Sequence, residues 1–277
     1  MSFYLNFTAP TTKKSLRLKE LNFLQYKTLN KFLINNNNTH IAEYFDQILK
    51  ECILDEATEL TNFDKFCALF LLRCTCVSPD IEFYIGTNTQ KTSLLNFLKD
   101  CLDFDTEFNR KISIDKSIEL QLSLPKNLNF ETTFDALHDC ITGVIYEGKK
   151  LIYRNVNELI EVLPAGITTH LKDFSDDLEK SFKKLIFKVG VKESEQFSIS
   201  PFNLSLLEVL KALFSSNLKN ILELQYLLVS KCRYNPDYID KSTLMENLIL
   251  VNIYETEVKA INEEQDKALE KTKPGNK

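Results

Sequence analysis

Apolar residues recur at helical spacing in several stretches of the chain and predict a fold dominated by α-helices. The first two stretches are Leu21 to Ile34 and Thr39 to Leu54. Between them lies the run Asn35 to Asn38. Because asparagine is common at helix caps, this run should end the first helix and cap the second. Thr61 and Asp64 resemble a capping box, which predicts the start of a third helix.

Other stretches alternate with a period of two and predict strands. Phe3 to Phe7 and Ser15 to Lys19 flank turn residues and are expected to form an N-terminal hairpin. A second hairpin is expected over residues 81 to 93, where an apolar run meets a polar tip. The alternation from Ile112 to Leu124 indicates half-buried strands. Residues 94 to 104 fit a strand or a short helix, and both alternatives stay open.

The second half of the chain repeats this outline of helices followed by a hairpin. Pro125 should end the alternating run. The helices expected after it span Thr132 to Tyr146, Asn157 to Leu163 and Ala165 to Lys183. They are followed by a hairpin over residues 185 to 200. No repeat at the level of single residues accompanies this shared outline.

The last part of the chain is helical by its apolar spacing. Ser200 and Pro201 fit an N-cap and the first helical position, which predicts a helix that runs to Phe214. Further helices are expected over Leu218 to Cys232 and from about Lys241 onward. All three belong to one C-terminal helical segment.

These elements predict an α+β fold that is helix-dominated, with two β-hairpins, a short N-terminal hairpin and a C-terminal three-helix unit. Three units are expected: an N-terminal α+β unit over residues 1–125, a central helical unit with a β-hairpin over 126–200, and a C-terminal helical unit over 201–277. Lys273 to Lys277 should be frayed. If residues 201–265 dock a partner, a chain cut after Ser200 is expected to stay folded but to lose that partner.

Composition and charge narrow the class of partner. The chain has 277 residues, of which 44% are hydrophobic and 26% charged, so it can bury a sizeable core. Its net charge is -5 and its lysines are scattered among acidic residues, so nucleic acid is not expected as a partner. The most apolar run, Cys67 to Leu72, is too short to span a bilayer, and no secretory leader is expected from the first residues.

The sequence holds little catalytic chemistry. Its seven cysteines lie mostly in apolar helical runs and are expected to be buried, reduced thiols. Cys74 and Cys76 lack the spacing of a zinc site. His138, Asp139 and Cys140 are neighbours in a predicted helix and therefore point apart, which disfavours a nucleophile with its base. No catalytic residue, metal, cofactor, membrane or small-molecule substrate is expected, and the chain is not predicted to be an enzyme.

The middle of the chain carries the most specific pattern. An apolar segment leads through a glycine turn and an acidic helix to an amphipathic helix and a strand. The residues are Asp139-Cys140-Ile141, Val144-Ile145-Tyr146, Gly148, Glu158-Leu159-Ile160-Glu161, Leu163, Phe174, Leu178 and Phe187 to Val189. This pattern resembles the baseplate hub and tail-assembly protein family of T-even-type contractile-tailed bacteriophages. Weaker agreement extends over nearly the whole chain.

The resemblance implies a non-enzymatic structural or assembly component of a contractile tail. Its partners would be other tail or baseplate proteins, or a second copy, and it would act in the host cytoplasm during assembly, with or without remaining in the virion. Members of the family often carry Cys-x-x-Cys pairs at two hairpin tips, but the tips here are Thr87 to Gln90 and Lys192 to Glu195, so metal ligation is not carried over. Composition alone equally permits an intracellular helical binding or regulatory module unrelated to phage tails.

The C-terminal helices carry the candidate partner surface. Apolar residues cover more than one face of two of them, so more than one face has to be buried. These residues are Leu218, Ile221, Leu222, Leu224, Leu227 and Leu228, then Leu244, Leu248, Ile249, Val251 and Ile253. Two interpretations stay open. The helices lie in the interior, which is the commoner cause of broad apolar faces, or residues 201–265 form a surface that docks another tail protein or a second copy. The aromatic anchors expected for docking are Tyr226, Tyr234, Tyr238 and Tyr254.

Overall fold

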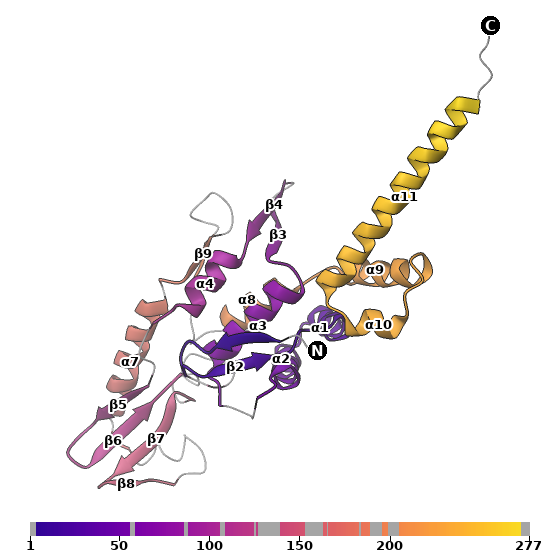
Figure 1. The fold of residues 1–277 in the computed structure, drawn as a ribbon. Coiled ribbons are helices and arrows are strands. Elements are labelled where there is room, and N and C mark those ends of the chain that lie inside the picture. Colours follow the sequence, from indigo (N-terminus) through magenta and orange to yellow (C-terminus); the bar gives the residue numbers. More distant parts are fainter. Residues whose placement is uncertain are drawn as a thin grey trace.

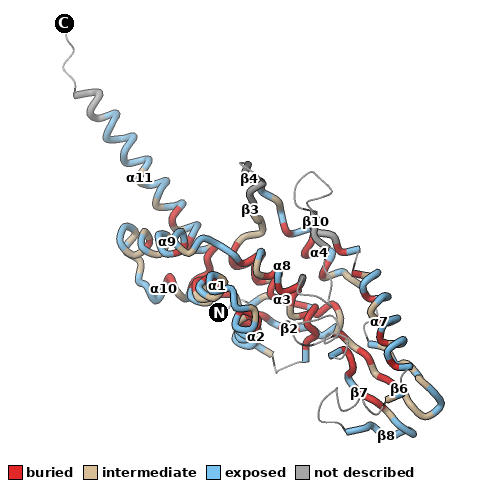
Figure 2. The backbone as a smooth tube through the Cα atoms, turned by 180° about the vertical axis from the view of Figure 1, so that it is seen from behind, coloured by how far each residue is buried: buried red, intermediate tan, exposed pale blue. Residues whose placement is uncertain are grey.

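A body of packed helices carries small antiparallel sheets, and one long helix projects from it at the C-terminal end (Figure 1). The computed structural model describes residues 4–55, 59–85, 88–105, 109–124, 126, 139–152, 163–164, 166–182, 184–188, 196–198 and 205–272. Within these residues the α+β, helix-dominated class is confirmed. Buried residues gather around α3 (Asn62–Cys76) and α8 (Ser205–Phe214), whereas the projecting helix is mostly exposed (Figure 2).

The predicted N-terminal hairpin is confirmed. It pairs β1 (Leu5–Thr8) with β2 (Ser15–Leu18) in antiparallel register. Its turn docks on the start of α3, where the buried carboxylate of Asp64 accepts hydrogen bonds from the backbone N–H of Thr11 at 2.8 Å and from its hydroxyl at 2.6 Å. One buried acid therefore joins the first hairpin to the central helix.

The asparagine run separates two helices as predicted. Helix α1 (Phe23–Asn35) ends at Asn36, which adopts a left-handed conformation with φ of 49°. Helix α2 (Asn38–Cys52) begins after Asn37, whose side chain accepts a hydrogen bond from the backbone N–H of His40 at 3.1 Å. Asparagine tolerates the left-handed region and also caps helix N-termini, so adjacent asparagines can end one helix and start the next.

Helix α3 lies at the centre of the core. The predicted capping box is confirmed, because the Thr61 hydroxyl accepts from the Asp64 N–H and the Asp64 carboxylate accepts from the Thr61 N–H. The helix is buried on nearly all sides, and its phenylalanines pack against aromatic rings from other segments. The Phe63 ring, for example, meets Phe182 edge-on with ring centroids 4.9 Å apart. Helix α8 packs closely on α3.

Both predicted β-hairpins are present. Strand β3 (Asp80–Ile85) pairs with β4 (Asn88–Ser93), and β9 (Ile186–Lys188) pairs with β10 (Gln196–Ser198), in both cases antiparallel. The segment that fitted either a strand or a short helix forms α4 (Leu95–Leu102).

The predicted helix from Thr132 to Tyr146 is wrong over its last part. Residues 141–146 form β7 (Ile141–Tyr146), the third strand of a sheet in the order β5-β6-β7-β8. The other strands are β5 (Arg110–Ser113), β6 (Ile118–Leu122) and β8 (Lys149–Lys150), and β5 and β6 confirm the predicted alternation. Val144 and Ile141 are buried where β7 pairs with β6, so burial against a half-covered strand overrides their helical spacing.

A tight turn joins β7 to β8. Glu147 and Gly148 have φ values of 48° and 78°, which is the arrangement of a type I′ hairpin turn, and glycine accepts the second value without strain. The glycine turn seen in the sequence is therefore a β-hairpin turn.

One more predicted helix is confirmed, and several other predictions concern residues outside those that the structure describes. Helix α7 (Ile167–Phe182) matches the prediction over Ala165 to Lys183. Outside the described residues lie Pro125, residues 132–138, most of the predicted helix from Asn157 to Leu163, Ser200, Pro201 and the terminal segment from Lys273.

The C-terminal segment has one more helix than predicted. After α8 come α9 (Leu218–Ser230), the short α10 (Pro236–Lys241) and α11 (Leu244–Thr272). Asn235 caps α10 and Pro236 occupies its first turn. Helix α8 packs on α3 and α1. Helices α9 and α10 pack on each other and on α1, and α11 packs on α9 and α3. The division into units at residues 125 and 200 stays a prediction.

Candidate protein-interaction surface

The four tyrosines predicted as anchors lie on the C-terminal helices and their connection. Tyr226 on α9 and Tyr238 on α10 are exposed, with relative accessibilities of 69% and 53%. Tyr234 and Tyr254 are half-buried. The structure stacks Tyr234 on Tyr238, with ring centroids 6.0 Å apart, and places Tyr226 and Tyr254 on two other helices. Two of the four tyrosines thus form a pair.

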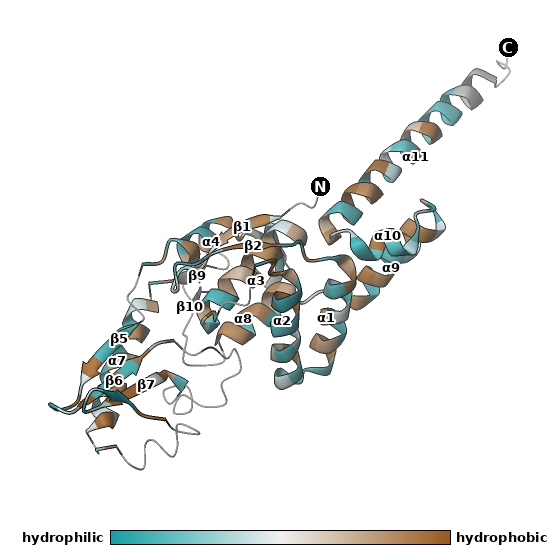
Figure 3. Ribbon diagram, turned by 60° about the horizontal axis from the view of Figure 1, so that its bottom comes forward, coloured by the Kyte–Doolittle hydropathy of each residue, from teal (hydrophilic) through white to brown (hydrophobic). Residues whose placement is uncertain are grey.

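Helices α9 and α11 each have a buried and an exposed apolar face. Ile221 and Leu228 of α9 are buried, and so are Leu244 and Val251 of α11, which confirms a core role for one face. The exposed apolar residues are Leu222, Tyr226, Leu248, Ile249, Ile253 and Ile261. Figure 3 shows hydrophobic and hydrophilic bands alternating along α11. Apolar side chains that gather on exposed faces, instead of standing singly, are typical of docking surfaces.

Buried polar contacts fix this surface to the body. The Lys27 ammonium of α1 donates to Asp240 of α10 at 2.9 Å and to Gln225 of α9 at 3.2 Å, and it also lies over the Phe23 ring. Asn247 of α11 is fully buried and donates to the Ile239 carbonyl at 3.1 Å. Because α9, α10 and the start of α11 are held by these contacts, their exposed faces are presented on a rigid support.

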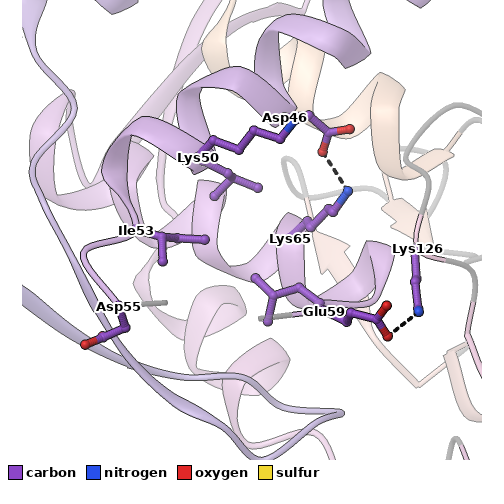
Figure 4. Close-up of a pocket in the computed structure, with 9 residues that line it drawn as sticks. Asp46, Lys50, Ile53, Asp55, Glu59, Lys65 and Lys126 are labelled. Carbon is purple, nitrogen blue, oxygen red and sulfur yellow. Dashed lines mark hydrogen bonds and ion pairs between the residues drawn. The ribbon is translucent and has the colours of Figure 1, made fainter. Parts of the chain in front are cut away.

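A second candidate is a surface pocket of about 510 Å³ beside α2 (Figure 4). Leu49, Ile53 and Leu60 supply its apolar lining. Two ion pairs lie at its rim, Lys65 with Asp46 at 2.7 Å and Lys126 with Glu59. An apolar floor inside a charge-balanced rim can admit one apolar side chain of a partner. Sequence patterns do not reveal it, since the paired residues are far apart along the chain.

Comparison with known proteins decides the family. A family model described as T4 bacteriophage base plate protein matches residues 2–223. The chain belongs to this family. No curated protein and no solved structure matches the chain. The family match ends within α9, so α10 and α11 of this baseplate protein lie outside it.

The cysteines of the baseplate protein lie in environments that suppress thiol chemistry. Burial raises the pKa of Cys52 and Cys74 to about 12 and that of Cys76 to about 11. Burial also raises the pKa of Cys140, while its neighbour Asp139 is exposed and His138 lies outside the described residues. Within the described part of the chain, no three His, Cys, Asp or Glu side chains cluster as metal ligands would, and no helix is long and apolar enough to cross a bilayer.

Thiol labelling should therefore separate one cysteine from the other six. Cys232 is half-buried, whereas the other six are buried, and the thiolate is the reactive form. We expect Ellman's reagent at pH 8 to titrate one thiol in the native protein and seven after unfolding in guanidinium. A Cys232→Ser variant should give no rapid reaction in the native state. Rapid modification of two or more native thiols would contradict this burial pattern.

Proposed function

We propose that this baseplate protein is a non-enzymatic component of the baseplate hub, or a factor that assembles the hub, and acts through protein contacts. The observation that carries the proposal is the set of apolar side chains left exposed on α9 and α11, within a family of phage baseplate proteins. Leu222 and Tyr226 lie one helical turn apart on α9, so they can enter the same partner groove.

The side-chain chemistry of the described residues supports a binding role over catalysis. An activated thiol needs a lowered pKa, and the shifts resolved for the cysteines are all upward because of burial. Several acidic groups are engaged in ion pairs with fixed partners, as in Lys65 with Asp46 and Arg110 with Asp177. Partly exposed pairs of this kind are typical of an ordinary protein surface.

The proposal is tested in the phage that encodes the protein. Deletion of the gene should stop assembly at a stage before complete baseplates, as seen by electron microscopy of lysates. Mass spectrometry of purified particles then separates a hub component, which stays in the virion, from an assembly factor, which leaves. Complete baseplates formed at the normal yield without the gene would contradict both forms of the proposal.

The surface on α9 is tested with matched substitutions. Leu222→Asp combined with Tyr226→Asp places two charges on the exposed apolar face and should lower the yield of complete baseplates about tenfold or more, because charges in an apolar contact lose several kcal/mol. The control is Leu95→Asp on α4, since Leu95 is also an exposed leucine, with a relative accessibility of 52%. It should assemble normally. Equal yields from the two variants would place the contact elsewhere.

A further inference from the structure

The apolar seam that seats α11 on the body continues beyond the body. Val251, Tyr254, Val258 and Ile261 follow one another at intervals of three, four and three residues, which is the spacing of a coiled-coil seam. Exposure rises along this line. Val251 has a relative accessibility of 9%, Tyr254 and Val258 are half-buried, and Ile261 reaches 53%. The same face of α11 is thus packed against the body at Val251 and faces solvent at Ile261.

The second half of α11 stands away from the rest of the protein. Residues 255–272 span about 27 Å at the rise of an α-helix. In Figures 1 and 3 this part of the helix extends from the body beyond α9 and α10. A helix that is polar all round would be a sufficient spacer in water. Instead, Val258 and Ile261 keep the line begun by Val251, so the apolar strip continues into the first part of the projecting segment and ends at Ile261.

Acidic residues border this strip on both sides. By helical position, Glu255 flanks it on one edge and Glu257 and Glu264 flank it on the other, and all three are exposed. Lys259 and Lys267 fall on the remaining surface of the helix. Each lysine lies four residues after a glutamate, a spacing that supports the helix itself. Over residues 255–267 the flanks of the strip are therefore negative, and the two lysines of this stretch lie on the remaining surface.

The flanking charge selects the occupant. A second copy aligned along this strip would bring two acidic borders together, and the chain as a whole already carries a net charge of -5. A helix with an apolar seam and lysine or arginine beside it would instead meet complementary charge. We propose that the stretch of α11 from Tyr254 to Glu264 docks a basic amphipathic helix of another baseplate protein, which lies along the strip as in a two-helix coiled coil. This inference rests on the proposed function and names the chemistry of one partner.

Two synthetic peptides test the inference with the full chain. Both are about 28 residues long, four heptads with leucine and isoleucine in the seam, and they differ only in carrying lysine or glutamate at the flanking positions. Fluorescence anisotropy should show binding of the lysine peptide and none of the glutamate peptide. Glu257→Lys with Glu264→Lys should reverse this preference. Equal binding of both peptides, or binding of neither, would overturn the inference.

Substitutions in the strip define where the peptide binds. Val258→Asp with Ile261→Asp should weaken binding of the lysine peptide about tenfold or more. The control, Ala260→Asp, adds one negative charge at an exposed position on the remaining surface of the helix and should leave binding unchanged. Undiminished binding by the strip variant would overturn the inference. So would a chain that dimerises in sedimentation equilibrium and loses the dimer with Ile261→Asp, because the occupant would then be a second copy.

Assembly in the phage separates the two proposals. The Val258 and Ile261 variant should lower the yield of complete baseplates, whereas Ala260→Asp should not. If the strip variant assembles normally while deletion of the gene blocks assembly, the inference is wrong and the proposed function stands. If the deletion assembles normally, the proposed function is wrong, whatever the peptides show.

Discussion

A chain that ends at Ser200 should fail to fold. A chain cut at this point was expected from the sequence to stay folded. In the structure, however, α8 belongs to the central core, because it packs on α3 and α1. Its buried residues are Leu206, Leu207, Leu210, Leu213 and Phe214. The Phe214 ring, for example, meets the Phe45 ring of α2 edge-on, with ring centroids 5.3 Å apart.

The size of the effect follows from the buried area that is lost. Full burial of a leucine or phenylalanine side chain contributes about 1.5–3 kcal/mol. Removal of α8 therefore forfeits on the order of 10 kcal/mol, and it also exposes the faces of α3 and α1 that α8 covers. A typical domain has only about 5–15 kcal/mol of net stability. The shortened chain should consequently populate unfolded or aggregated states.

Circular dichroism during a urea titration measures whether the chain that ends at Ser200 is helical and unfolds cooperatively. The sequence has no tryptophan and ten tyrosines, so tyrosine fluorescence is the matching optical probe. The control is a chain that ends at Glu255, which loses only the projecting part of α11 and should unfold cooperatively near the midpoint of the full chain. A cooperative transition from the chain that ends at Ser200 would show that α8 is dispensable for the core.

Local chemistry made several elements predictable. The Asn36 and Asn37 caps and the Thr61 and Asp64 capping box need only residues that lie within one turn of each other, so their geometry can be read from the sequence. The glycine turn at residue 148 was visible for the same reason. Asn235 and Pro236 form a comparable start signal for α10. This signal is easily missed because the helix is short and its apolar pattern is weak.

The strand over residues 141–146 could not be predicted from its own pattern. Ile141, Val144 and Ile145 recur at helical spacing, so a helix was expected. Strand β6 supplies the missing information, since its Leu120 needs a covering neighbour and pairs with Val144. Gly143 lies opposite Gln121, where an added Cβ would come within 2.8 Å of the Gln121 side chain. The deciding contact is thus more than twenty residues away.

The candidate surface was predictable in location but not in detail. Broad apolar faces after residue 217 indicated either core or docking, and the structure assigns one face of each helix to the core. The partly buried ion pair of Lys27 with Asp240, which orients the surface, joins residues 213 positions apart. No local pattern marks such a pair. The same holds for Tyr234 and Tyr238, whose stacking depends on the turn into α10.

Replacing Arg73 should give the largest loss of stability among single polar substitutions near the core. The Arg73 side chain is buried at the end of α3 and donates to three backbone carbonyls. Its partners are Leu213 of α8 at 2.5 Å, Ser78, and Asp80 at the start of β3 at 3.2 Å. Burial lowers the pKa of Arg73, but an arginine remains charged in proteins. One guanidinium therefore joins α3, α8 and the first hairpin after α3.

Arg73→Met keeps the length of the side chain and removes its donors. Three carbonyls then lose their partner, and an unsatisfied buried acceptor costs about 1–3 kcal/mol. Because the Ser78 and Asp80 carbonyls are only partly buried, water can replace some of the lost bonds, and we expect the free energy of unfolding to fall by about 2–4 kcal/mol. The free energy of unfolding of Arg73→Lys should lie between those of Arg73→Met and the unchanged protein. One ammonium cannot serve the three positions that a planar guanidinium reaches.

Urea unfolding of the full chain measures the effect as a shift in midpoint at constant slope. Lys91→Met is the matched control, because Lys91 forms an exposed ion pair with Asp80 on the same hairpin and should leave the midpoint almost unchanged. The loss should also appear as faster hydrogen exchange in α8, where the Leu213 carbonyl is released. If Arg73→Met unfolds at the midpoint of the control, the three carbonyls are satisfied without the guanidinium and Arg73 does not join these elements.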